Sequence, residues 1–390
     1  MELSDTFNFL SSQAGLECAE EVPPHGGQSR SSKTDSMNRR SKFEPVISEA
    51  VMSGGKRIPL LKTLQTSSCE RNCYYCPFRA GRNFHRATLK PDEMAKSFMA
   101  LNRAGIAKGI FLSSGIAGGG IRTQDQLLAT AEILRFKHNY SGYLHLKLMP
   151  GAERDQILRA MQLADRVSVN LEAPNTQRLA RLAPRKAFMD ELMQPMRWVE
   201  EIRKTQSPYL AWKNKWPSMT TQFVVGAVGE NDLELLQTTA YLIHNLRLSR
   251  AYFSTFNPIR DTPFENLPAE SYRRTQRLYQ ASFLLRDYNF RLEDFTFGAS
   301  SNLPPDVDPK TAWAQVNLSE KPVEINKADR YDLLRIPGIG PKGADAILKN
   351  RRQNHLRSVD DLRSIGINPT RAIPYILLDG SRPSRQLKFW

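Results

Sequence analysis

The chain has 390 residues, with 55 Lys and Arg against 40 Asp and Glu, so its formal net charge is +15 at pH 7. Hydrophobic residues make up 40%, which is enough for a packed core, and no apolar run is long enough to span a bilayer. We find no signal peptide, so we expect a cytoplasmic protein with no membrane partner. The excess of basic residues favours a polyanionic partner, most simply nucleic acid, over a basic surface without a dedicated ligand.

Composition divides the chain into four expected parts. Residues 1–55 form a basic, partly flexible extension that is rich in Pro, Gly and Ser at its centre. Residues 56–302 form the large domain, and residues 303–322 form a linker that opens with three prolines in LPPDVDPK. Residues 323–390 form a small, basic, helical domain with a basic tail.

Short apolar runs alternate with amphipathic stretches throughout the large domain. The predicted strands are 58–66, 108–114, 142–149, 165–172, 220–228 and 250–258. A helical pattern follows each one, which predicts a parallel sheet with right-handed crossovers. Six units are too few to close an eight-stranded barrel, so we expect an α/β fold that is either a partial barrel or a doubly wound sheet. In both folds, the functional site lies at the carboxyl ends of the strands.

Three of the four cysteines lie in CERNCYYC, residues 69–76, directly after the first predicted strand. Disulfides between such close neighbours are poor in a reducing compartment, and structural cysteines do not usually cluster in a polar loop. Two metal sites therefore stay open. One is zinc held by Cys69, Cys73, Cys76 and His85. The other is a [4Fe–4S] cluster held by the three thiolates, which leaves one iron open to a substrate or cofactor.

CxxxCxxC in the loop after the first strand of six β/α units resembles the signature of the radical SAM superfamily, as does the aromatic Tyr75 before the last cysteine. The resemblance implies a partial (β/α)6, TIM-like barrel in which Cys69, Cys73 and Cys76 hold a [4Fe–4S] cluster. It also implies that S-adenosylmethionine chelates the fourth iron and is cleaved reductively to a 5′-deoxyadenosyl radical, which abstracts a hydrogen atom from substrate. An electron donor such as flavodoxin or ferredoxin is then an implied partner.

The resemblance further implies contacts to S-adenosylmethionine from several segments at the strand ends. The expected cosubstrate-binding residues are Tyr75, Ser113, Ser114, Gly115, Asn170, Glu172, Gly226 and Asn257. The segment SSGIAGGG (113–120) lacks the acidic residue usual in such a segment. Glu172 and Lys147 are the candidates for a catalytic role, and a salt bridge between them is the alternative. The basic loop RLAPRK (181–186) would guide phosphates or form a solvated helix end.

LLRIPGIGPKGADAILKNR, in the C-terminal part, resembles a helix–hairpin–helix motif. Gly338, Ile339 and Gly340 form the expected tight turn, and Lys342 adds a positive charge at the start of the second helix. Backbone N–H groups there would face a phosphate without reading sequence, whereas a hairpin used for packing is the alternative. Basic residues around it favour nucleic acid; they are Arg335, Lys349, Arg351, Arg352 and Arg357. The expected caps of the flanking helices are Asn326 and a Ser358–Asp361 capping box.

From Pro59 onward, the chain is similar to a radical SAM family described as DNA modification or repair proteins, through segments such as FLSSGI, ADRVSVNLE and TQFVVGA. This implies an enzyme that acts on a nucleotide of DNA, with a DNA-repair protein as a further partner. The target base would be flipped out or already single-stranded. The alternatives are a radical SAM enzyme acting on tRNA or another RNA, and a non-catalytic, zinc-stabilised nucleic-acid-binding protein.

Overall fold

The computed structural model describes residues 2–14, 47–51 and 57–383. Cys18, most of the expected N-terminal extension and the end of the basic tail lie outside the described residues. The chain divides into two compact units. The first comprises residues 1–230 and 241–272, and the second comprises residues 231–240 and 273–390.

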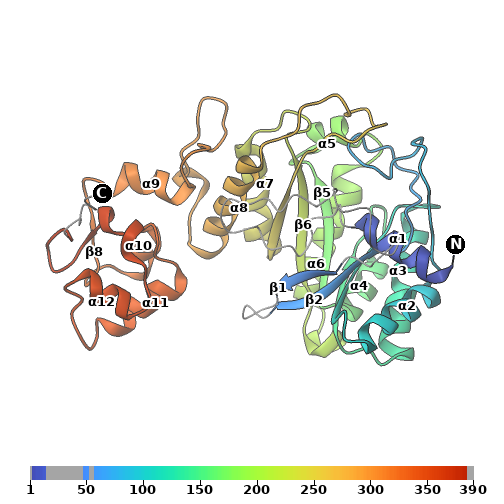
Figure 1. Cartoon of the computed structure of the whole chain (residues 1–390), viewed down its shortest axis with the longest axis horizontal. Helices are drawn as coiled ribbons and strands as arrows, with labels where there is room; N and C mark the ends of the chain where they lie inside the picture. The colour runs from blue at the N-terminus through green and yellow to red at the C-terminus, as the bar shows by residue number, and fades with distance from the viewer. Residues whose placement is uncertain (1, 15–46, 52–56, 384–390) are drawn as a thin grey trace, which may run out of the picture. The chain divides into compact units, whose positions relative to one another are not determined.

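A seven-stranded sheet forms the centre of the first unit, and its strands lie side by side in chain order (Figure 1). The strands are β1 (Ile47–Val51), β2 (Arg57–Leu64), β3 (Gly109–Ser113), β4 (Tyr143–Lys147), β5 (Arg166–Glu172), β6 (Ser218–Val225) and β7 (Arg250–Thr255). β2 to β7 run parallel, whereas β1 pairs with β2 in the antiparallel sense. The parallel strands are the six predicted ones, and the sheet curls into a half-barrel, so the expected α/β fold class is confirmed.

Helices connect consecutive parallel strands, as right-handed crossovers require. They are α2 (Pro91–Arg103), α3 (Gly120–Glu132), α4 (Arg154–Leu163), α5 (Thr176–Leu182), α6 (Gln194–Thr205) and α7 (Asp232–Leu246), with α8 (Tyr272–Asp287) after β7. α2 shows why such segments are helical: Pro91 starts its first turn, two carboxylates follow, and an apolar face is buried. Ahead of the sheet, α1 (Leu3–Ala14) packs on β2. Among the described residues, no helix is both long and apolar enough to cross a membrane.

The concave face of the half-barrel carries polar side chains deep inside the first unit. His145, Ser168 and Thr220 are at most 3% exposed and lie two residues before the pocket-lining positions of β4, β5 and β6, so they share the face of those positions. The His145 Nε2 and Ser168 Oγ atoms are 2.9 Å apart. Branched apolar side chains usually fill the interior of such a barrel. The layer of buried polar side chains therefore indicates that this face has a role beyond packing.

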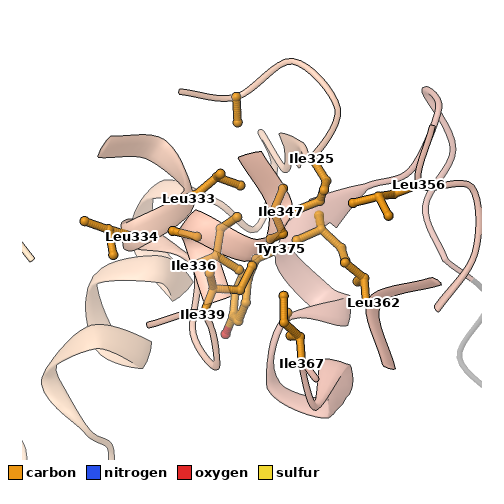
Figure 2. Close-up of a cluster of buried hydrophobic side chains, with 14 of the residues drawn as sticks. Ile325, Leu333, Leu334, Ile336, Ile339, Ile347, Leu356, Leu362, Ile367 and Tyr375 are labelled. Carbon is orange, nitrogen blue, oxygen red and sulfur yellow. The ribbon is translucent and has the colours of Figure 1, made fainter. Parts of the chain in front are cut away.

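The second unit contains a compact helical core. Its further elements are β8 (Val323–Glu324), β9 (Ile376–Leu377) and the helices α9 (Pro309–Asn317), α10 (Arg330–Arg335), α11 (Pro341–Asn350) and α12 (Val359–Ser364). Figure 2 shows the apolar cluster on which they converge, with Ile325, Leu333, Ile347 and Leu362 all fully buried. α10, α11 and α12 each contribute to this cluster, through Leu333, Ile347 and Leu362 respectively, so each helix turns an apolar face inward.

Two expectations about this unit need correction. The first helix of the hairpin is capped by Asp329, whose side chain accepts from the Asp332 N–H, and not by Asn326. Asn326 instead pairs with the backbone of Leu356, 30 residues away in the chain. The capping box of Ser358 and Asp361 at the start of α12 is confirmed.

Arg335 is a core residue, although the sequence suggested a basic surface position. Its side chain is 2% exposed and forms an ion pair with Asp294 at 2.9 Å. Its guanidinium lies over the rings of Phe290 and Trp313, at 4.0 and 4.9 Å from their centroids. Trp313 belongs to α9, which lies in the expected linker 303–322. The expected domain ranges stay a prediction, but part of that linker is packed helix.

Candidate functional site

A pocket at the carboxyl ends of the parallel strands brings the three cysteines together with residues of β2, β4, β5 and β6 and with the segment that follows β3. It is lined by Leu64, Cys69, Arg71, Cys73, Tyr75, Cys76, Pro77, Phe78, Ser114, Gly115, Ile116, Lys147, Leu148, Met149, Pro150, Asn170, Glu172, Lys186 and Gln222. Nine of these are residues singled out from the sequence: the cysteines, Tyr75, Ser114, Gly115, Lys147, Asn170 and Glu172. The parallel order explains this convergence, because all the strands end at one edge.

Three expected cosubstrate-binding residues do not line this pocket. Ser113 is fully buried as the last residue of β3. Gly226 adopts a positive φ of 97°, but a Cβ there would lie 2.5 Å from the Glu270 side chain, so the close approach it permits is to protein. Asn257 lies just beyond β7, is exposed and donates to the carbonyl of Thr255, the last residue of that strand. Their assignment to S-adenosylmethionine stays a prediction.

The cysteine loop is held by polar contacts that the sequence did not indicate. Arg86 donates to the carbonyls of Ser67, Phe78 and Arg79, on both sides of the cysteines. Arg71 forms an ion pair with Glu191 at 2.5 Å. The planar guanidinium group presents five N–H donors in a rigid fork, so one arginine can bind several acceptors at once. The loop is therefore fixed in place by two arginines from the region of the cysteines themselves.

Glu70, between the first two cysteines, reaches the glycine segment after β3. Its Oε2 accepts from the N–H groups of Gly118 and Gly119, at 3.2 and 3.3 Å. Both glycines have positive φ, which lets the chain turn sharply into α3. A carboxylate at the start of a helix is favourable for the helix dipole. The acidic group that SSGIAGGG lacks in sequence is thus present in space, supplied by the cysteine loop.

The three thiols are unbridged, and the surroundings of Cys73 and Cys76 oppose ionisation in the absence of a bound cation. Burial raises the pKa of Cys73, and the nearby Lys186 ammonium counteracts part of this rise. Burial also raises the pKa of Cys76, with the neighbouring Cys73 adding to it. A bound metal centre would supply the positive charge that stabilises the thiolates, with release of protons on binding.

Glu172 occupies a special backbone position at the end of β5. Its φ is +66°, at a bulge in the pairing with β6, and its side chain is 5% exposed. Oε1 accepts from Lys186 Nζ at 3.1 Å, whereas Oε2 has no hydrogen bond of good geometry from the described residues. Burial alone would lower the pKa of Lys186, but Cys73 and Glu172 raise it above its usual range. Burial and then the Glu172 charge raise the pKa of Tyr75.

Lys186 lines the pocket, although the sequence did not indicate a clear role for it. It ends the basic loop RLAPRK, which reads equally well as a solvated helix end, yet its side chain is only 9% exposed. A further residue, Gln222 of β6, was not singled out. The available signal was the polar series Ser218, Thr220 and Gln222 at alternate positions of β6.

The donor set fits a cluster better than a single ion. Within the described ranges, no three His, Cys, Asp or Glu side chains converge on one metal-ion position. His85, the fourth ligand of the zinc alternative, packs its ring against Phe9 at 5.0 Å and does not line the pocket. An iron–sulfur cubane is larger than one ion and takes one thiolate for each iron. Cys69, Cys73 and Cys76, spread around one pocket, suit that larger group.

The hairpin of the second unit presents the start of α11 at its surface. Gly338 has a φ of +87°, and Gly340 is the N-cap residue ahead of Pro341. Lys342 is exposed, and the N–H groups of the first helical turn have no acceptor within the helix. These residues line a surface hollow together with Gly343, Gly366, Ile367 and Asn368. An anion is a suitable ligand for such a site.

Ile339 differs from its neighbours in the hairpin. Its side chain is 1% exposed within the apolar cluster, and its N–H donates to the carbonyl of Ile336 at 3.1 Å. The expected basic surround is likewise reduced, since Arg335 is buried and Arg351 donates to the carbonyls of Ile325 and Ala328. Lys349, Arg352 and Arg357 are exposed. The hairpin surface therefore keeps a basic character with fewer charges than the sequence suggested.

Comparisons with known families match both parts of the chain. Residues 64–242 match the family model of the radical SAM superfamily, and residues 318–370 match that of the helix-hairpin-helix motif. The first match begins at the end of β2 and includes the cysteine loop, and the second spans the hairpin. None of the curated proteins compared with the chain matches it.

Several solved structures are similar to part of the chain. HydG, a maturase of the [FeFe]-hydrogenase, is 10% identical with a TM-score of 0.45, and the match covers 58% of this chain and 49% of HydG. Methylornithine synthase is 16% identical with a TM-score of 0.46, covering 60% and 64% of the two chains. A radical SAM methyltransferase from Sphaerobacter thermophilus is 16% identical with a TM-score of 0.43, covering 61% and 70%. The chain thus spans about half the length of HydG.

Proposed function

We propose that this chain modifies or repairs a nucleotide of DNA. The premise is that the chain is a radical SAM enzyme with a C-terminal helix-hairpin-helix motif. Such an enzyme uses a [4Fe–4S] cluster and S-adenosylmethionine, and it needs an electron donor. The observation that supports DNA as substrate is the presence of the hairpin in the same chain as the radical SAM domain. A hairpin of this kind suits backbone binding, because its contacts do not depend on sequence.

The roles that we assign within the pocket follow from which residues line it. Cys69, Cys73 and Cys76 would hold three irons of the cluster. When bound, the cluster supplies the electron that cleaves S-adenosylmethionine to the radical that abstracts a hydrogen atom from substrate. Ser114, Gly115, Asn170 and Glu172 are our candidates for contacts with the cosubstrate, and Tyr75 for packing against it.

Two basic side chains of the pocket suit negatively charged groups. Lys147 is 7% exposed at the end of β4, and Lys186 is held by Glu172. An ammonium in so dry a setting attracts a carboxylate or phosphate more strongly than it would in water. We assign Lys147 to an anionic group of the substrate or cosubstrate and Lys186 to holding Glu172 in position. The same burial excludes water, which protects a reactive radical.

The proposed division of labour is that the hairpin holds the nucleic-acid backbone while the pocket takes the target nucleotide. A base within a duplex would have to leave the stack, or the substrate would be single-stranded. Lys342 and the first-turn N–H groups of α11 are the proposed phosphate contacts, so affinity should fall as salt rises.

The deciding experiment is anaerobic. We would reconstitute and reduce the cluster, then quantify 5′-deoxyadenosine with no nucleic acid, with duplex DNA, with single-stranded DNA and with tRNA. Stimulation of 5′-deoxyadenosine formation by DNA supports the proposal if a Lys342→Gln variant requires a higher DNA concentration than the wild type for the same stimulation. Stimulation by tRNA alone would transfer the function to RNA. Indifference to every polymer would remove nucleic acid as the substrate.

A further inference from the structure

Gln222 is a buried polar residue whose hydrogen-bonding capacity the protein itself does not use fully. It lies on β6, three residues before the end of the strand, is 6% exposed and lines the same pocket as the cysteines. Its Oε1 has no hydrogen-bond donor among the described residues. Buried amide oxygens in folded proteins nearly always have a donor. A donor supplied by a ligand in the pocket would account for this one.

The surroundings of Gln222 extend below the strand ends. It pairs in register with Asn170 of β5, and both face the pocket with Lys147 of β4. One layer deeper on the same face, Thr220 Oγ1 is also buried without a hydrogen-bond partner among the described residues. On β6, buried polar atoms without a hydrogen-bond partner among the described residues therefore extend into the half-barrel, away from the loops in which the cysteines and Gly115 lie.

We propose that Gln222 binds the hydrogen-bonding edge of the substrate's nucleobase, an inference that rests on the proposed function. A carboxamide combines one acceptor with an N–H donor, which is the pattern that a base edge complements. Enzymes that act on an extruded base recognise it by hydrogen bonds to that edge. Lys147, on the same wall of the pocket, supplies a positive charge suited to the nucleotide's phosphate. Gln222 is then a specificity-determining residue inside the barrel.

S-adenosylmethionine also carries groups that can donate to Oε1, so the experiment must separate cosubstrate from substrate. Gln222→Met keeps the length of the side chain and removes both hydrogen-bonding groups. Thr221→Val is the matched control, because Thr221 is the adjacent residue on the opposite face of β6 and its Oγ1 donates to the carbonyl of Val169 at 2.7 Å. Both variants are made in the full chain with a reconstituted cluster.

Two readouts are compared for the wild type and both variants. The first is the rate of 5′-deoxyadenosine formation with single-stranded oligodeoxynucleotides, with abasic oligomers of the same length, and with varied S-adenosylmethionine. The second is equilibrium dialysis of the four deoxynucleoside 5′-monophosphates against the cluster-loaded protein. We expect Gln222→Met to lose roughly tenfold in base-dependent stimulation and in affinity for at least one mononucleotide, the size of effect typical of one buried hydrogen bond. The KM for S-adenosylmethionine should stay within about twofold, and Thr221→Val should behave like the wild type in both readouts.

The outcomes distinguish this inference from the proposed function. DNA stimulation that is equal in Gln222→Met and wild type, with unchanged mononucleotide affinity, overturns the inference and leaves the function standing. A raised KM for S-adenosylmethionine with no loss of mononucleotide affinity assigns Gln222 to the cosubstrate and also overturns it. Mononucleotide binding that depends on Gln222, without stimulation by any polymer, supports the inference and removes DNA as the substrate. If no mononucleotide binds the wild type and no base-dependent stimulation occurs, both ideas fail.

Discussion

Lys186 Nζ lies 3.1 Å from Glu172 Oε1, and the two side chains are 9% and 5% exposed. Removing one partner of so buried a pair leaves the other charge without compensation. We therefore expect Lys186→Met to lower the free energy of unfolding by about 3 kcal/mol. Urea unfolding of the cluster-free protein measures this. The double variant Lys186→Met with Glu172→Gln should recover part of the loss, and an unchanged midpoint in the single variant would contradict the prediction.

Cys73→Ala should abolish cluster assembly while leaving DNA affinity unchanged, because Cys73 lines the pocket of the first unit and the proposed DNA contacts belong to the second. Iron and sulfide content after reconstitution, visible absorption and a DNA-binding titration check both halves. Cys18→Ala is the matched control, since Cys18 is not part of the CxxxCxxC motif. A Cys73→Ala protein that still yields 5′-deoxyadenosine would refute the assignment of this thiol.

Lys342→Gln should weaken DNA binding about equally for all sequences and lower the slope of log affinity against log salt by about 1. The physical reason is the loss of one charge at the exposed start of α11. Titrations at several salt concentrations measure the slope. Lys321→Gln, an exposed lysine of the same unit outside the hairpin, is the control. Equal slopes in the two variants would limit the hairpin to packing.

Lys310 should make the stability of the second unit depend on pH. Burial lowers its pKa to about 7, and the nearby Arg371 adds to the effect. Its ammonium donates to the carbonyl of Ile339 in the hairpin. In the unfolded chain, its pKa is near the usual value of about 10.4. Between these two values the unfolded state binds more protons, so the free energy of unfolding rises with pH by up to about 1.4 kcal/mol per pH unit.

The measurement for Lys310 is the unfolding midpoint between pH 7 and pH 9.5. Lys310→Met should remove most of the rise with pH that the wild type shows. Lys327→Met, which alters an exposed lysine of the same unit, should keep the rise. Parallel curves for wild type and Lys310→Met would show that Lys310 keeps its charge in the folded protein.

The sequence predicted the sheet well because its pattern is local. Apolar runs of strand length alternate with amphipathic stretches, and the position of CERNCYYC after the first of them places the cysteines at the correct edge. The partners of charged residues were harder to predict, since an arginine or lysine looks the same in sequence whether it is solvated or buried. Arg335 illustrates this limit: only the fold brings Phe290, Trp313 and Asp294 around it.

Backbone geometry was a second feature that the sequence pattern did not specify. Gly226 has the positive φ that its motif suggested, but Glu270 from a distant part of the chain fills the space beside it. Glu172 was expected to face the pocket by simple alternation along β5, and it does so at a bulge that no pattern of alternation predicts. Contacts across 40 residues or more depend on tertiary structure, which local propensity does not specify.

The second unit takes its residues from two separate stretches of chain, 231–240 and 273–390. Asp232 of the first stretch forms an ion pair with Arg274 of the second at 2.8 Å, and it also accepts from the N–H of Leu303. A single protease cut between residues 241 and 272 would therefore leave these two stretches joined by noncovalent contacts. For the same reason, the chain must be synthesised beyond Leu303 before residues 231–240 can form all of these contacts. A fragment that starts at residue 323 would lack Trp313, which contacts Arg335, and is therefore a poor tool for isolating the hairpin.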